Sequence, residues 1–191
     1  MLRRLAVFGS RTELAGPDEL AAAHRLGRLI GEQSVTVVSD GAPAGTLAVL
    51  VEAASKAGGR LIGVSVSDAT EPARADLTEH RRVADAAAWR SEIGSLAEAW
   101  LALPGAFENL EDAFALWAWT ARPPKEQPLG LLDSADYYSS LLKTASDPAV
   151  DRFVLESQRG RLVVAKDPAE LLRRLSEYRP PETRRDTFDD D

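Results

Sequence analysis

The stretch EAWLALPGAFENLED, residues 98–112, decides the fold of this chain. Its uninterrupted apolar run, Trp100–Leu103, is typical of a strand that is buried on both faces of a parallel sheet. Pro104 and Gly105 end that strand, and the residues after them favour a helix. A strand that leads through a short loop into a helix is the repeating unit of an α/β fold. In such folds, ligands bind beyond the carboxyl ends of the strands.

The same unit recurs on both sides of this stretch. Apolar runs predict strands over 5–8, 35–38, 60–66, 100–103, 128–132 and 162–165. Helical spacing predicts helices over 18–30, 46–57, 86–98, 109–121 and 137–144, and a last one that begins at Pro168 with Asp167 as its cap. This alternation predicts an α/β fold, a Rossmann-like doubly wound sheet that is mostly parallel, with helices on both faces in three layers.

Several local expectations follow from the same patterns. Asp18 is expected to cap the first helix and Gly31 to end it. In the helix over 109–121, the side chains expected to point inward are Leu110, Phe114 and Trp117. The basic cluster that begins at His80 is expected to be a solvated loop.

Composition bounds the class of protein. The chain has 191 residues, 45% hydrophobic and 28% charged, which is typical of one globular domain; we place that domain at 1–179. Residues 180–191 are expected to form a disordered acidic tail. The absence of cysteine excludes disulfides, thiolate catalysis and cysteine-based zinc sites.

Charge and hydropathy limit the partners. A net charge of −7 argues against nucleic acid, because the phosphate backbone repels an acidic protein. The apolar run near the N-terminus is too short for a signal-peptide core, and no run approaches the roughly 20 residues of a membrane span. We therefore expect a cytoplasmic protein without a membrane partner.

Segments spread along the chain resemble a known family. They are LAVFGS (5–10), AAHRLGRLI (22–30), GGRLIGV (58–64), WLALPG (100–105), WAW with PLGLL (117–119, 128–132) and YYSSLL (137–142). In this order they resemble the Lonely Guy (LOG) family, Rossmann-like proteins often mislabelled as lysine decarboxylases, and the resemblance runs from Leu5 to Leu175. Known members hydrolyse cytokinin riboside 5′-monophosphates to free base and ribose phosphate. They commonly form dimers with sites near the interface.

The family's phosphate-binding motifs are altered here. The motif GGG-x-x-G-x-M-G corresponds to DGAPAGTLA, residues 40–48, so Asp40 replaces a glycine. The motif PGG-x-GT-x-x-E corresponds to PGAFENLED, residues 104–112, where Glu108 replaces a glycine and Asp112 the catalytic glutamate. A carboxylate about 4 Å from a phosphate would repel it by roughly 4 kcal/mol at an effective dielectric of 20. Alternatively, Asp40 and Glu108 are solvated loop residues, or a pair that favours a cationic or metal-bearing ligand.

The family's catalytic arginine lies in a segment like MHERK. An ungapped alignment places AAAWR, residues 86–90, on that segment, so that Trp89 stands at the arginine position. Arg90 replaces the arginine only after a slip of one residue, since neighbouring residues on a helix point about 100° apart. Trp89 itself would either pack in the core or stack on a base.

The loops and the resemblance together define the candidate site. The candidate catalytic residues are Asp112 and Arg90. The candidate ligand-binding residues are Gly9, Ser10, Gly41, Gly45, Thr46, Gly105 and Asn109, although glycines there can also serve only a tight turn. We expect no metal and no cofactor.

The altered motifs favour a LOG-like protein that binds a nucleotide or nucleotide-derived ligand without efficient phosphoribohydrolase activity. Molybdenum cofactor carriers, which share this fold, are a precedent for carriage without hydrolysis. One alternative is a divergent phosphoribohydrolase that uses Asp112 and Arg90, and another is a structural partner of an active homologue. A homodimer is expected in each case, with helix 110–121 at its interface because that helix is apolar on more than one face.

Overall fold

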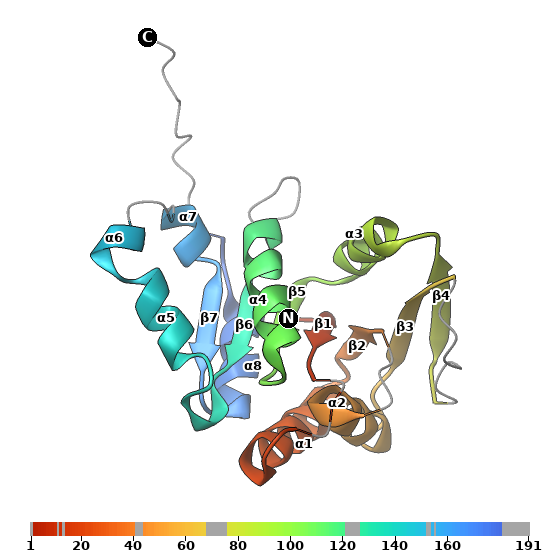
Figure 1. The fold of residues 1–191 in the computed structure, drawn as a ribbon. Coiled ribbons are helices and arrows are strands. Elements are labelled where there is room, and N and C mark those ends of the chain that lie inside the picture. The colour runs from red at the N-terminus through yellow and green to blue at the C-terminus, as the bar shows by residue number, and fades with distance from the viewer. Residues whose placement is uncertain are drawn as a thin grey trace.

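A computed structural model describes residues 2–10, 12, 14–40, 44–67, 76–120, 127–151, 154 and 156–180 of the chain. Seven strands in these residues form one sheet in the order β4-β3-β2-β1-β5-β6-β7 (Figure 1). Every neighbouring pair is parallel. The strands are β1 (Arg4–Phe8), β2 (Thr36–Ser39), β3 (Leu61–Val66), β4 (Glu79–Val83), β5 (Ala99–Ala102), β6 (Leu129–Leu132) and β7 (Leu162–Ala165).

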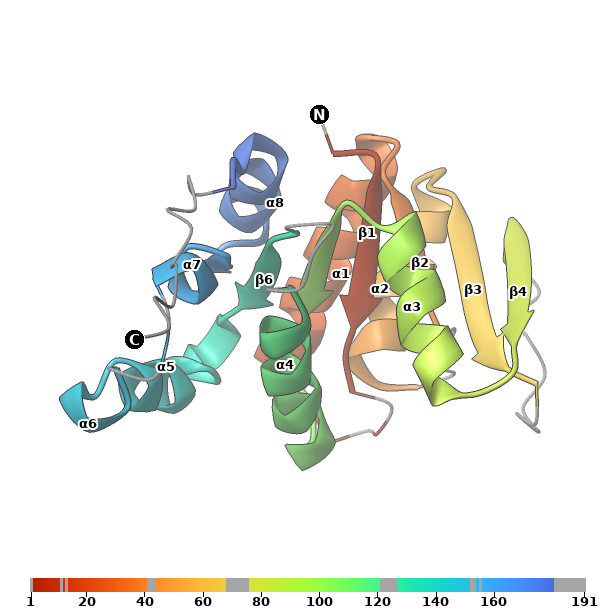
Figure 2. The ribbon, with the colours of Figure 1, turned by 90° about the horizontal axis from the view of Figure 1, so that it is seen from above.

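Helices cover both faces of this sheet and enclose two hydrophobic cores (Figure 2). One core lies under α1 (Pro17–Glu32), α2 (Gly45–Lys56) and α8 (Pro168–Glu177). The other lies under α3 (Ala86–Leu96) and α4 (Phe107–Thr120). Shorter elements after β6 are η1 (Ser134–Asp136), α5 (Ser139–Ala145), α6 (Pro148–Asp151) and α7 (Glu156–Arg159). The predicted three-layer, doubly wound fold is confirmed.

The strand order shows where a doubly wound sheet commonly binds its ligand. From β1 the chain proceeds outward to β2, β3 and β4, then returns to the other side of β1 as β5 and continues to β6 and β7. The direction of winding thus reverses between β1 and β5, where Leu103 N–H donates to Phe8 O at 2.8 Å. Loops that diverge at such a reversal leave a crevice at the carboxyl ends of the strands.

Close contact between α1 and α2 explains a wrong expectation about Gly31. Gly31 does not end α1, which continues to Glu32 and has Gln33 as its C-cap. A Cβ on Gly31 would lie 2.5 Å from Ala54 O, and a Cβ on Gly27 only 2.2 Å from Leu50 O. These two glycines, one helical turn apart, let the backbones of α1 and α2 touch. Asp18 is likewise not the N-cap, which is Gly16.

The largest missed element is β4, because its basic residues suggested a loop. Glu79–Val83 alternates between half-buried and exposed positions at the edge of the sheet, where charged side chains are common. Arg81 donates hydrogen bonds to Glu79 and to Glu92 on α3. These bonds raise the pKa of Arg81, and the bond to Glu92 has the larger effect. His80 Nε2 lies 2.9 Å from Ser65 Oγ on β3. The sequence EHRRV has no alternation of apolar and polar residues, so this strand is recognised only from its pairing with β3.

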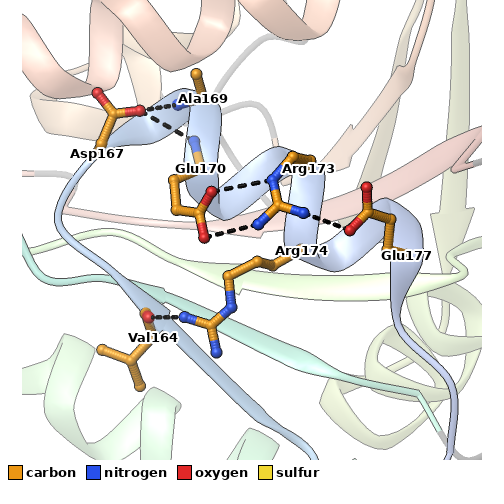
Figure 3. A network of polar contacts seen from close by, with 7 residues as sticks. All are labelled: Val164, Asp167, Ala169, Glu170, Arg173, Arg174 and Glu177. Atoms are coloured by element: carbon orange, nitrogen blue, oxygen red, sulfur yellow. Dashed lines mark hydrogen bonds and ion pairs between the residues drawn. The ribbon is translucent and has the colours of Figure 1, made fainter.

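Helix α8 begins where the sequence predicts. The Asp167 carboxylate accepts hydrogen bonds from Ala169 N and Glu170 N at 2.9 and 3.0 Å (Figure 3). These bonds, above all the one from Glu170 N, lower the pKa of Asp167. Arg25 of α1 forms an ion pair with Asp167 at 2.8 Å. Within α8, Arg173 bridges Glu170 and Glu177, and Arg174 donates to Val164 O of β7. The cap and these contacts fix α8 against β7 and α1.

Two further expectations concern exposure. Phe114 was expected to point inward but is 48% exposed, whereas Leu116 and Trp117 of the same helix are buried. Among the described residues, no helix has the length and apolar character that a membrane span requires. Of the predicted acidic tail, 180–191, residues 181–191 lie outside the described residues.

The contact between α1 and α2 leads to a prediction about stability. Replacing Gly27 with alanine should lower the free energy of unfolding by about 1–3 kcal/mol, because the added methyl group meets Leu50 backbone atoms. Urea unfolding of purified protein measures this change. Arg28→Ala, on the exposed face of the same helix, is the control and should cost about 0.5 kcal/mol or less, since it removes only an exposed ion pair with Glu32. Equal effects of the two substitutions would contradict the packing argument.

Candidate functional site

A buried threonine joins three loops at the reversal point. Thr46, in the first turn of α2, is fully buried. Its hydroxyl accepts a hydrogen bond from Ser10 N, after β1, and donates one to Pro104 O, after β5; both distances are 3.0 Å. The structure thus brings three of the predicted loops together through one side chain.

Two glycines allow the loops to approach this closely. Gly45 has a φ of +75°, and a Cβ there would lie 2.1 Å from Ser10 O. A Cβ on Gly105 would lie 2.0 Å from Asn109 Oδ1 and 2.9 Å from Ser10 Cβ. Because only glycine tolerates both the left-handed conformation and the contact, Gly45 is required for packing whatever the loop binds. A Cβ on Gly9 would lie 2.9 Å from Thr46 Oγ1 and 3.1 Å from Leu103 Cδ1.

Two polar residues of the predicted ligand site form hydrogen bonds within their own loops. Ser10 is buried, and its hydroxyl lies 2.9 Å from Thr12 Oγ1 and accepts from Thr12 N at 3.0 Å. Asn109 is also buried, at the start of α4, with its backbone N–H on Ala106 O. Gly41 and the side chain of Glu108 lie outside the described part of the structure. The roles of Gly9, Ser10, Gly45, Thr46, Gly105 and Asn109 in binding stay predictions.

A tyrosine pair that sequence reasoning did not assign to the site holds the loop after β5. The Tyr138 hydroxyl donates to Leu103 O at 2.9 Å and the Tyr137 hydroxyl to Ala106 O at 3.3 Å. Burial, then the neighbouring Tyr137, Asp112 and Asp133, raise the pKa of Tyr138, so its hydroxyl stays a proton donor. The run YYSSLL was a visible signal, but its spacing alone does not show which loop the hydroxyls reach.

The turn that precedes the tyrosines has an unusual backbone. Ala135 and Asp136 have φ values of 53° and 58°, in the left-handed region that most residues avoid. The Asp133 carboxylate accepts from Tyr138 N at 2.6 Å and from the Ser139 hydroxyl at 3.1 Å, which holds the turn in place. Strain of this kind concentrates near functional sites.

The two candidate catalytic residues come from different helices on the same face of the sheet. Asp112 lies in the second turn of α4, is exposed, and contributes to the electrostatic environment of the Tyr138 hydroxyl. Arg90 lies in α3 and is exposed. Their catalytic roles stay predictions.

Trp89, at the position aligned with the family arginine, packs against the sheet. Its indole N–H donates to Val64 O at 2.9 Å, and its ring meets Phe8 edge to face with centroids 5.7 Å apart. Phe8 in turn stacks on Trp100 at 5.5 Å. The residue is half-buried, so part of the indole remains exposed.

Two helix N-termini at the candidate site present backbone groups without a side-chain cap. The N-termini of α1 and α2 have no side-chain cap, whereas Asp85 caps α3 and Asp167 caps α8. In the parts of the chain that the structure describes, no group of three or more histidine, aspartate or glutamate residues could hold a metal ion.

Comparisons with known proteins identify the family. The family model described as "Possible lysine decarboxylase" matches residues 47–175. A cytokinin riboside 5′-monophosphate phosphoribohydrolase of Arabidopsis thaliana is 30% identical over 181 residues, which cover 93% of this chain and 83% of that protein. The chain belongs to the LOG family. A LOG-family enzyme of the same name from Rhodococcoides fascians is 32% identical over 148 residues, covering 76% of this chain and 75% of its own length.

Solved structures show the same fold at lower identity. A molybdenum cofactor binding protein from Rippkaea orientalis superposes with a TM-score of 0.68 and 18% identity, covering 93% of this chain and 97% of its own. The molybdenum cofactor carrier protein of Chlamydomonas reinhardtii gives a TM-score of 0.66 and 19% identity, covering 93% and 98%. At these identities the likeness shows the fold alone.

The threonine that joins the loops yields a second prediction. Thr46→Val keeps the shape of the side chain but leaves Ser10 N–H and Pro104 C=O without their partner. Each buried unpaired group costs about 1–3 kcal/mol, so the free energy of unfolding should fall by about 2 kcal/mol or more. Thr46→Ser keeps the hydroxyl and loses one methyl group, so the free energy of unfolding should fall by only about 1 kcal/mol. Chemical denaturation of both variants tests this order; a valine variant as stable as the serine variant would show that the hydroxyl does not join the loops.

Proposed function

We propose that this LOG-family chain binds a nucleotide or nucleotide-derived ligand in the crevice between the loops after β1, β2 and β5, without efficient phosphoribohydrolase activity. The supporting observation is Trp89. Trp89 stands at the position aligned with the family arginine. Its indole N–H donates to Val64 O, and its ring packs on Phe8. An indole carries no positive charge to stabilise a departing or phosphorylated group.

The expected loss of rate follows from that substitution. Removing one charged or hydrogen-bonding group that stabilises a transition state costs about 10²- to 10³-fold in rate. Asp40 directly follows β2, where the family has a glycine, and its negative charge would add repulsion towards a phosphate placed there. Carriage of a small ligand would tolerate both changes, and two proteins of this fold are named for binding or carrying the molybdenum cofactor.

A hydrolysis assay tests this proposal. Purified protein incubated with AMP or with a cytokinin riboside monophosphate should release no appreciable free base, because the aligned cation is absent. Chromatography of the reaction mixture measures the base. Turnover near one per second, abolished by Asp112→Asn, would overturn the proposal.

Restoration of the family motif is the complementary experiment. The combined variant Asp40→Gly, Trp89→Arg, Glu108→Gly and Asp112→Glu should gain release of free base from AMP, because it regains the aligned cation and loses two carboxylates near the phosphate. No gain by a variant that folds correctly would mean that the resemblance to active relatives ends at the fold.

A divergent phosphoribohydrolase is the second candidate. It is supported by the 30% identity to a relative named as a phosphoribohydrolase over 93% of this chain. Asp112 keeps a carboxylate next to the buried Tyr138, and Arg90 on α3 would supply the cation. In that case Arg90→Ala should abolish base release, whereas Trp89→Phe should leave most of it. A cytoplasmic location stays a prediction for either candidate.

We also propose that the chain forms a homodimer through α4. Phe107 is 82% exposed and Phe114 48% exposed. Residues seven apart lie on the same side of a helix, so the two rings form an apolar strip that a second copy would cover.

Light scattering tests the dimer. At micromolar concentration the natural chain should have the mass of two copies, and the double variant Phe107→Ser, Phe114→Ser should have the mass of one. Leu14→Ser, which changes a residue that is 79% exposed outside α4, is the matched control and should remain dimeric. A monomeric natural chain would contradict the proposal.

A further inference from the structure

Strand β2 is shorter than its neighbours at the ligand edge of the sheet. Its last residue, Ser39, pairs with Gly63, whereas β3 continues to Val66. On the other side, Val38 pairs with Ala6, and β1 continues to Phe8. Asp40 directly follows Ser39, the last residue of β2, so continuing the register of β2 by one residue places it level with Phe8 of β1 and Val64 of β3.

The alternation of side chains gives the face on which position 40 lies. Ala6, Val38 and Ile62 form one row across three strands in the core under α3. Two residues further along, Phe8 and Val64 belong to the same core. Side chains two apart on a strand point to one face, so the alternation of β2, continued by one residue, assigns Asp40 to this second row on the α3 side.

Trp89 of α3 lies over this second row. It contacts both flanking members, through the 5.7 Å ring contact with Phe8 and the 2.9 Å hydrogen bond to Val64 O. These two contacts, on strands that β2 separates, fix the indole across the end of β2. Both Trp89 and Asp40 are half-buried, so part of each residue's surface is exposed.

We propose that Trp89 and Asp40 form a nucleoside subsite, in which the indole stacks on the base and the carboxylate accepts hydrogen bonds from the sugar hydroxyls. An aromatic ring held in place stacks on any base, because every base has a π-face. An acidic residue on the ribose 2′-hydroxyl is the arrangement of many dinucleotide-binding sheets.

This subsite orients the ligand. A carboxylate repels phosphate and attracts hydroxyl donors, so the end of β2 takes the sugar and base, and the phosphate lies towards the backbone N–H groups of the loops after β1 and β5. The inference rests on the proposed function, since it assigns the nucleoside half of a nucleotide ligand to particular residues.

Calorimetric titration with three ligands tests the subsite. AMP, 2′-deoxy-AMP and ribose 5-phosphate would be titrated into the natural chain and into variants whose folding is checked by thermal melting. The natural chain should bind AMP about ten-fold more tightly than 2′-deoxy-AMP, as expected for the loss of a hydrogen bond to a charged group. Asp40→Ala should remove this preference, whereas Glu52→Ala, which removes an exposed carboxylate of α2, should keep it.

The tryptophan variants test the stacking. Trp89→Leu should weaken AMP binding about ten-fold or more while leaving ribose 5-phosphate unchanged, and Trp89→Phe should retain most of the affinity. Equal binding of AMP and 2′-deoxy-AMP to the natural chain, or unchanged AMP binding by Trp89→Leu, would overturn the subsite and leave nucleotide binding intact. Failure of all three ligands to bind the natural chain would instead overturn the proposed function itself.

Discussion

The hydroxyl of Thr46 is the interaction on which the ligand edge of this protein depends. It bonds to Ser10 after β1 and to Pro104 after β5, the two strands between which the winding of the sheet reverses. Loops at such a reversal diverge, so something must set the distance between them. One buried hydroxyl, used as donor and as acceptor, fixes both loops to the start of α2.

Because polar groups of the loops hold them in place, the scaffold keeps Gly45 and Gly105 of the family motifs but does not need their other glycines. Tyr137 and Tyr138 hold the loop after β5 from the side of β6, and the hydroxyl of Ser10 is bonded to Thr12. Substitutions at positions such as Asp40 and Trp89 can therefore change what the crevice binds without changing its frame. This separation explains how the chain keeps the LOG fold while its charged site residues differ from the family pattern.

The sequence predicts the fold well because periodicity and apolar runs determine it. Each predicted strand begins and ends within one residue of an observed strand. Asp167 caps α8 as expected. The errors come from tertiary contacts. Gly31 looks like a helix end but makes room for α2, and the basic residues of β4 look like a loop but pair at the edge of the sheet.

The candidate site was only partly predictable, for a related reason. Glycines and hydroxyl residues after strands mark the loops, and the structure brings Ser10, Thr46 and Gly105 together. Sequence spacing does not reveal that Thr46 spans two loops, nor that Tyr138 reaches back to Leu103, because both contacts join segments more than 30 residues apart. The outward direction of Phe114 likewise depends on how α4 sits on the sheet.

Native mass spectrometry of the purified chain with AMP tests the central claim most directly, because it reports binding and the chemical state of the ligand together. The account predicts a complex whose added mass is that of intact AMP, unchanged over hours of incubation. A complex that carries only ribose 5-phosphate or only adenine would contradict it, and so would the absence of any complex at ligand concentrations that saturate a related enzyme.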